Sequence, residues 1–222
     1  MPTTAGTAPP LIHVPPKPRL RGALHLVAFP VSLLAGGVLL ALADDLAERW
    51  ACLVYTAAAA VLFGCSALYH RGTWDARTHA RLRRLDHSNI FLMIAGTYTP
   101  LCVALLEGTT RAVVLVVVWV GALAGIVFRV AWLDAPAWLY TPFYVALGWV
   151  AIAVLPSLAR AGGATVTALV VGGGVAYSAG GTVYALRRPD PAPATFGYHE
   201  LFHTGTIVGY VCHYVAIALA VH

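Results

Sequence analysis

Seven long apolar stretches with few charged residues constrain the fold of this chain more than any other feature of its sequence. They cover about residues 22–43, 50–70, 87–106, 112–131, 138–158, 163–186 and 199–221. Each is long enough to cross the ~30 Å hydrocarbon core of a bilayer as a helix. Helices are expected because backbone polar groups in lipid need partners within the same segment. Only 10% of the residues are charged, against roughly 25% in soluble domains. The sequence therefore predicts an all-α membrane protein, a seven-transmembrane helix bundle.

The domain organisation follows from what lies outside these stretches. Residues 1–20 form a Pro-rich segment, with six prolines among the first 18 residues. This composition is typical of a disordered tail. Residues 21–222 are expected to form one seven-helix transmembrane domain, since no remaining stretch is long enough for a soluble domain.

Basic residues predict the orientation in the membrane, because loops on the cytoplasmic side carry the excess of Lys and Arg. With the N-terminus in the cytoplasm, three basic residues fall outside the cell: Arg49, Arg111 and Arg160. Eleven fall inside: Lys17, Arg19, Arg21, Arg71, Arg77, Arg81, Arg83, Arg84, Arg129, Arg187 and Arg188. We therefore expect the N-terminus to be cytoplasmic and the C-terminus to be outside.

Three of the apolar stretches carry polar residues at the ends that this orientation places in the inner leaflet. The second stretch ends in SALYH (residues 66–70), the third begins with LDHSN (residues 85–89), and the seventh begins with HELFH (residues 199–203). Because successive crossings run in opposite directions, these three ends are expected at the same depth in the membrane. Ionisable residues inside a membrane bundle are costly and usually functional.

The residue types in these ends predict a zinc site. His199 and His203 are four residues apart, so both imidazoles project from one face of a helix. Zinc binds such nitrogens, and a catalytic site takes three protein ligands and keeps one position open. His70 is the expected third ligand. Asp86 is the expected fourth, either directly or through a water that it holds. Ser66 lies one turn before His70 and could orient the water or the substrate.

Other interpretations of these residues stay open at this point. Asp86 could cap a helix that begins there, and Ser66 could bond to the preceding helical turn. Glu200 resembles the general base of HExxH metalloproteases, but it points about 100° away from His199 around the helix. It could instead lie at the headgroup boundary or near the N-terminal end of the helix dipole. His213 could line a cavity above the site or pack against another helix, and His87 could support the site or lie at the interface.

Three segments closely resemble the signatures of bacterial hemolysin III proteins, which belong with the progestin and adipoQ receptors. They are SALYH, RLRRLDHSNIFLMIAGTYTP and HELFHTGTIVGYVCHYVAI. The resemblance covers essentially residues 20–222. It implies seven helices, a cytoplasmic N-terminus and zinc in the inner-leaflet half. The zinc histidines correspond to His70, His199 and His203, with Asp86 near the zinc water and Ser66 at the serine of the first motif. Similarity to alkaline ceramidases suggests hydrolysis of a lipid amide or ester.

Two classes of function remain. The first is a zinc-dependent hydrolase of a lipid amide or ester in the cell membrane of a bacterium, with membrane lipids as partners. The second is a non-enzymatic protein: a pore-forming, cytolytic hemolysin, as the family name implies, or a receptor-like sensor with structural zinc. A wide pore needs polar residues along the whole crossing, whereas here they cluster at one end. We therefore favour the hydrolase.

Overall fold

The computed structural model describes residues 17–222 as an all-helical chain, with no named strand in that range. Its helices are α1 (Ala23–Leu42), α2 (Leu46–Arg71), α3 (Ala76–Leu105), α4 (Gly108–Ala131), α5 (Ala137–Gly148), α6 (Leu155–Leu186) and α7 (Tyr198–Ala220), with a 3₁₀ segment, η1 (Trp149–Val154), between α5 and α6. Residues 1–16, most of the predicted disordered tail, lie outside the described residues.

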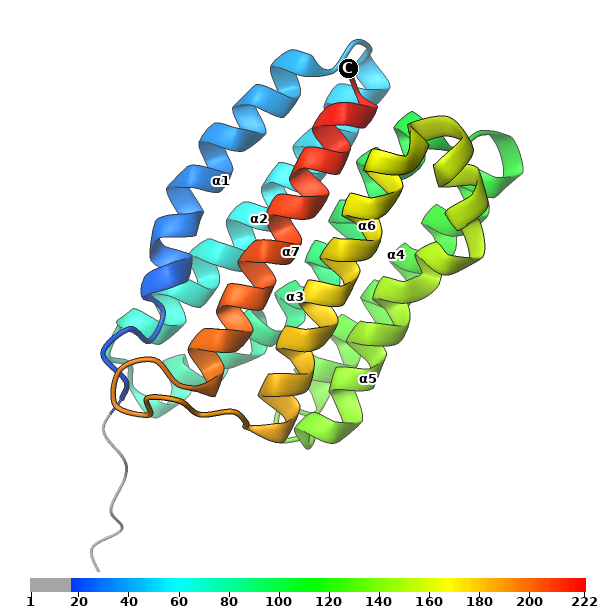
Figure 1. The fold of residues 1–222 in the computed structure, drawn as a ribbon. Helices are drawn as coiled ribbons and strands as arrows, with labels where there is room; N and C mark the ends of the chain where they lie inside the picture. Colours follow the sequence, from blue (N-terminus) through cyan, green and yellow to red (C-terminus); the bar gives the residue numbers. More distant parts are fainter. Residues whose placement is uncertain (1–16) are drawn as a thin grey trace, which may run out of the picture.

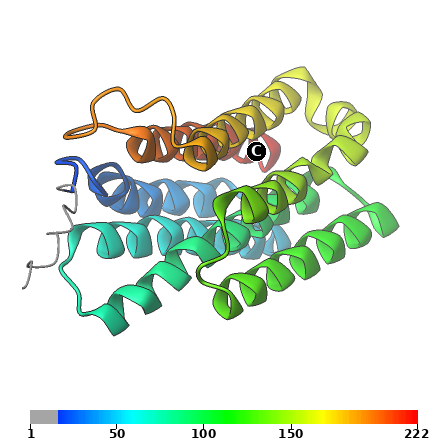
Figure 2. The ribbon, with the colours of Figure 1, turned by 90° about the horizontal axis from the view of Figure 1, so that it is seen from below.

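The helices pack side by side as one bundle (Figure 1). Neighbouring pairs include α1 with α2, α2 with α3, α3 with α4, and α6 with α7. Figure 2, which shows the molecule from below, places α7 beside α1 and α6, so the last helix closes the bundle against the first. The first described residues and the C-terminus lie at opposite ends of the bundle (Figure 1).

Within residues 17–222, six helical runs are long and apolar enough to cross a membrane. The fifth is a run of 50 residues, Ala137–Leu186, which takes in α5, η1 and α6. This run is not straight, because Gly163 has a non-helical backbone with φ 73°, and α5 and α6 pack against one another. The predicted count of seven crossings is therefore not settled by length and composition, and it stays a prediction.

The outward-facing side chains are apolar. Leu34 on α1 is 76% exposed and Val127 on α4 is 66% exposed. The buried polar side chains, by contrast, lie inside the bundle on several helices. An apolar exterior around a partly polar interior is the arrangement expected for a protein whose solvent is lipid.

The third helix begins eleven residues before the predicted start, so one expectation about its boundary was wrong. The basic segment of residues 76–86 was predicted to be a loop, but it forms the first turns of α3. Asp75 caps this helix, since its Oδ1 accepts hydrogen bonds from the backbone N–H groups of Arg77 and Thr78 at 2.9 and 3.0 Å. The alternative that Asp86 is the helix cap is therefore also wrong. Charge marks where a helix leaves the lipid, and it does not mark where the helix ends.

Candidate metal centre

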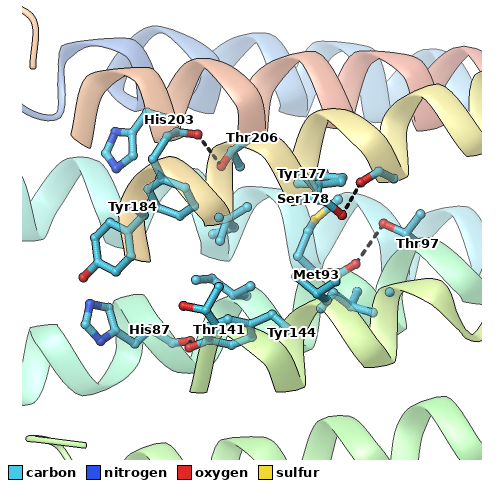
Figure 3. Close-up of a pocket in the computed structure, with 18 of the residues that line it drawn as sticks. His87, Met93, Thr97, Thr141, Tyr144, Tyr177, Ser178, Tyr184, His203 and Thr206 are labelled. Atoms are coloured by element: carbon cyan, nitrogen blue, oxygen red, sulfur yellow. Dashed lines mark hydrogen bonds between the residues drawn. The ribbon is translucent and has the colours of Figure 1, made fainter. Parts of the chain in front are cut away.

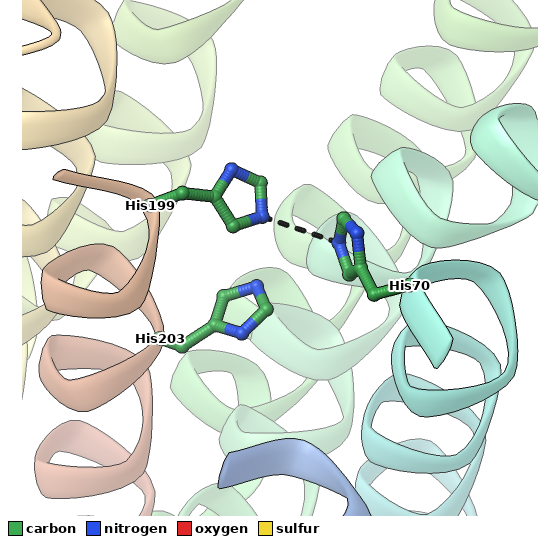
Figure 4. Close-up of side chains that lie close together, drawn as sticks. All are labelled: His70, His199 and His203. Atoms are coloured by element: carbon green, nitrogen blue, oxygen red, sulfur yellow. Dashed lines mark hydrogen bonds between the residues drawn. The ribbon is translucent and has the colours of Figure 1, made fainter. Parts of the chain in front are cut away.

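Three histidines from two helices meet at one end of the bundle. His70 lies in the last turn of α2, and His199 and His203 lie in the first two turns of α7. Figure 4 shows their imidazoles facing one another. One ring nitrogen from each lies within 4.8 Å of the others, and all three residues are buried. The ring of His70 lies 4.7 Å from that of His199 and 5.3 Å from that of His203, measured between centroids. The predicted proximity of these three residues is confirmed.

The nitrogen spacing matches a tetrahedral metal ion. The Nε2 atoms of His199 and His70 are 3.2 Å apart. Zinc–nitrogen bonds of ~2.0–2.1 Å at a tetrahedral angle place two ligand nitrogens about 3.3 Å apart. Two neutral imidazoles can also share one hydrogen bond at this distance, so the spacing fits a metal but does not require one. The donor set, three imidazole nitrogens, suits zinc among several transition metals.

Asp86 and Ser66 lie beside the histidines. The Oδ2 of Asp86 is 3.7 Å from the Nε2 of His70, and the residue is buried near the middle of α3. Asp86 lies outside the group of three whose ligand atoms are mutually close. Ser66 is buried one turn before His70 on α2, and both Ser66 and Asp86 line the same cavity. The carboxylate therefore lies directly beside the histidine cluster, close to van der Waals contact with the imidazole of His70.

Glu200 belongs to the helix terminus and not to the histidine cluster. Its Oε2 accepts a hydrogen bond from the backbone N–H of Gly197 at 2.8 Å, which closes a capping box at the start of α7. Its Oε1 accepts one from the Nε of Arg21 at 2.6 Å. Both oxygens of this buried carboxylate are thus engaged away from the histidines. The HExxH pattern here is a histidine pair with a helix cap between its members.

His25 is a fourth histidine at the cluster, and the sequence did not identify it. Its ring on α1 stacks on that of His203, with centroids 3.8 Å apart and 9° between the planes. Both ring nitrogens are buried and have no hydrogen-bond partner within residues 17–222. His25 is not one of the three histidines whose ligand atoms are mutually close. Its contact with the cluster holds the ring of His203 on one side.

A buried arginine supports the cavity wall near Asp86. Arg129 was expected in a connecting loop, but it is fully buried in the last turn of α4. Its Nη2 lies 2.6 Å from the Nδ1 of His87 and donates to the carbonyl of Leu133 at 3.2 Å. Its guanidinium lies 4.1 Å from the ring centre of Tyr140. Because a guanidinium only donates hydrogen bonds, the Nδ1 of His87 is the acceptor, so His87 has a supporting role.

An elongated cavity of about 120 Å³ extends from the histidine cluster into the bundle. Its wall includes Asp86, His199 and His203 at one end and Trp149 and His213 at the other. Figure 3 shows side chains of this wall, among them Tyr144, Tyr177 and Tyr184. His213 both lines the cavity and contacts α6, where its Nε2 lies 3.1 Å from the carbonyl oxygen of Val170. Both roles considered for this residue are therefore realised.

Comparison with known proteins agrees with this architecture. The family model described as "Haemolysin-III related" matches residues 14–214. The chain belongs to the haemolysin III family. It is 36% identical over 150 residues to the "Hemolysin-3 homolog" of Bacillus subtilis (strain 168), a match that covers 67% of each chain. It is 34% identical over 96 residues to "Hemolysin-3" of Bacillus cereus, which covers 43% of this chain and 44% of the relative. With six apolar helical runs in the part of the chain that the structure describes, this haemolysin III protein is a multi-pass bacterial membrane protein.

Proposed function

We propose that this haemolysin III protein is a zinc-dependent hydrolase that cleaves an amide or ester of a membrane lipid. The observation that carries the proposal is the cluster of His70, His199 and His203, with nitrogens at metal-binding distances beside a buried carboxylate. The elongated cavity that starts at this cluster supports a lipid substrate.

The proposal requires seven crossings with the N-terminus inside. A straight helix of 50 residues would be about 75 Å long, more than twice the ~30 Å hydrocarbon core, so Ala137–Leu186 is better read as two crossings. The first described residues and the C-terminus lie at opposite ends of the bundle, which favours an odd number (Figure 1). The count of basic residues favours a cytoplasmic N-terminus. In this orientation the cluster lies in the inner leaflet.

Zinc at this position would supply a Lewis acid that polarises a carbonyl and lowers the pKa of water. His70, His199 and His203 would hold the metal, and Asp86 would orient the attacking water and accept its proton. Ser66 lines the same cavity as Asp86 and would keep its carboxylate oriented. The cavity would hold the acyl chain and exclude bulk water from the reacting carbonyl. The proton accepted by Asp86 would then pass to the leaving amine or alcohol.

Metal analysis of the purified full-length protein tests the proposed ligands. We expect about one zinc per chain in the wild type, as three histidine ligands imply, and strong loss in His70→Ala and His203→Ala. His222→Ala is the matched control, because His222 is exposed and follows the end of α7 opposite to His199 and His203. Equal zinc content in all four proteins would refute the ligand assignment. A screen for release of fatty acid from amide and ester lipids then tests hydrolysis.

A pore is the second candidate, because both relatives are described as hemolysins. The cavity is narrow and its wall is mostly apolar, which opposes a wide aqueous channel. Conductance in planar bilayers, without lipid turnover and unchanged by His199→Ala, would favour the pore over the hydrolase.

A further inference from the structure

The end of the cavity away from the histidine cluster carries a pair of polar rings. Tyr177 on α6 and His213 on α7 have ring centroids 5.6 Å apart, and the Tyr177 hydroxyl and the His213 ring are buried. Both residues line the cavity, and Figure 3 shows Tyr177 at this end. His213 lies ten residues after His203, which corresponds to about 15 Å along α7. The pair is thus well separated from the proposed metal ligands.

Each member of the pair has one unused polar atom. The Nε2 of His213 must donate to the carbonyl of Val170 at 3.1 Å, because a carbonyl only accepts. The Nδ1 of a neutral imidazole is then an acceptor. Neither this Nδ1 nor the hydroxyl of Tyr177 has a hydrogen-bond partner in the part of the chain that the structure describes. Together they offer one O–H donor and one nitrogen acceptor.

Other polar side chains at this end are satisfied within the protein. The hydroxyl of Thr97 donates to the carbonyl of Met93 at 2.8 Å. The hydroxyl of Ser178 donates to the carbonyl of Gly174 at 2.8 Å and accepts from the indole of Trp149 at 2.9 Å. Buried polar groups are nearly always hydrogen-bonded. The two unused atoms therefore indicate an occupant of the cavity.

Two glycines make room for the pair in a reciprocal way. A Cβ at Gly173 on α6 would lie 2.6 Å from the Nε2 of His213, and a Cβ at Gly209 on α7 would lie 2.6 Å from the ring of Tyr177. Each polar ring thus lies over a glycine of the opposite helix. The site is built into the α6–α7 interface, since any larger residue at either glycine would displace a ring.

We propose that Tyr177 and His213 recognise a hydroxyl group on the apolar chain of the ligand. A hydroxyl both accepts and donates, so it can accept from the Tyr177 O–H and donate to the His213 Nδ1 at the same time. The distance from the cluster places this hydroxyl midway along a long acyl chain. This inference rests on the proposed function only for the position of the reactive end of the acyl chain, at the histidines. The preferred ligand class is accordingly a long-chain acyl group with an internal hydroxyl.

Competition binding with two matched fatty acids tests this selectivity. In this assay, stearate and 12-hydroxystearate each compete with a fluorescent fatty acid for binding to the purified full-length protein in detergent. We expect about a tenfold preference for 12-hydroxystearate in the wild type, the effect of one well-placed hydrogen-bonding group. Tyr177→Phe and His213→Phe should each remove most of this preference, by lowering the affinity for 12-hydroxystearate much more than the affinity for stearate. Thr97→Val is the control, because Thr97 is already satisfied, and it should keep the preference.

Equal affinity for the two acids in the wild type would mean that the pair binds water alone, and it would overturn the proposal. A preference that survives Tyr177→Phe, or absence of binding by either acid, would overturn it as well. Binding to protein stripped of metal by a chelator separates this result from the proposed function. If zinc and hydrolysis are absent but the hydroxyl preference persists, only the hydrolase fails; if hydrolysis is found without the preference, only the selectivity fails.

Discussion

Glu200 offers the sharpest test of how the HELFH segment works. In a metalloprotease-like interpretation Glu200 is a general base, whereas its contacts indicate a structural role at the start of α7. Its carboxylate joins the start of α7, through the N–H of Gly197, to the residue Arg21 just before α1. Glu200→Gln keeps a side-chain oxygen for Gly197 and removes the charge that pairs with Arg21. Glu200→Ala removes both contacts.

The contacts set the expected losses of stability. A cap hydrogen bond contributes about 0.5–2 kcal/mol, and a hydrogen bond to a charged group contributes about 1.5–3 kcal/mol. Glu200 is 1% exposed and the side chain of Arg21 is 19% exposed, so little screening by solvent applies. Glu200→Ala should therefore cost about 3–5 kcal/mol, as expected for a buried pair that loses one partner. Glu200→Gln should cost about 1.5–3 kcal/mol.

Thermal or denaturant unfolding of the purified variants measures these costs, and zinc analysis is done on the same samples. A double-mutant cycle with Arg21→Met should give a coupling of about 1–3 kcal/mol, because the two side chains are in contact. Glu200→Gln should keep the zinc content of the wild type. A stable Glu200→Gln protein whose lipid hydrolysis is abolished would refute the structural interpretation and restore Glu200 as a general base.

Three further perturbations test the packing and the termini. Gly36→Ala should destabilise the protein by about 1–3 kcal/mol, because a Cβ there would overlap Thr56. Gly37→Ala should be neutral or stabilising, because nothing lies within 4 Å of a Cβ at that position. Denaturant unfolding of the two variants gives the comparison. His87→Leu should cost about 2 kcal/mol, since it leaves the charged Arg129 without its 2.6 Å acceptor, and a loss no larger than that of an exposed control such as His222→Ala would contradict this role. The pKa of Asp75 is lowered by hydrogen bonds from the Thr78 hydroxyl and from backbone N–H groups. The cap formed by Asp75 therefore stabilises α3 at neutral pH, and this stabilisation is lost as the pH falls through the lowered pKa. Between neutral and acid pH, the free energy of unfolding should consequently fall less in Asp75→Ala than in the wild type.

The histidine cluster could be predicted because the depth of a residue in the membrane depends only on the order of the crossings along the chain. Membrane crossings alternate in direction, so the depth of His70 and of the HELFH pair follows from counting segments. The spacing of His199 and His203 then places both rings on one helical face. Asp86 was placed at the same depth by the same reasoning, although the start of its helix was predicted wrongly. An error in a helix boundary therefore did not affect the site, because depth depends on the order of crossings.

Contacts around the helix axis were harder to predict, because lipid and the bundle interior are both apolar. On α4 the buried residues are Val114, Val118, Ala122 and Arg129, and the first three look like residues that face lipid. The inner side of α4 is marked by small residues, since Gly121 and Gly125 lie on the same stripe and approach Leu147 and Phe91. Arg129 lies four residues after Gly125 on this stripe, but its contacts with Tyr140 and His87 depend on tertiary packing, which the spacing of α4 does not encode.

Helix α1 also carries a signal for its inner face, in this case a polar one, which was not used in the prediction. Its buried residues are His25, Ser32, Gly36 and Leu39. His25 and Ser32 are seven residues apart, and Gly36 follows after four more, which places all three on one stripe of a helix. The same spacing places His199, His203, Thr206 and His213 on the buried face of α7. In a membrane helix, polar and small residues at intervals of three, four or seven thus indicate the interior, where a hydropathy profile shows only an apolar run. Applied to α1, this rule predicts that His25 faces the interior of the bundle. Since His25 is expected at the same end of the bundle as the HELFH segment, the rule predicts from the amino-acid sequence alone that it neighbours the histidine cluster.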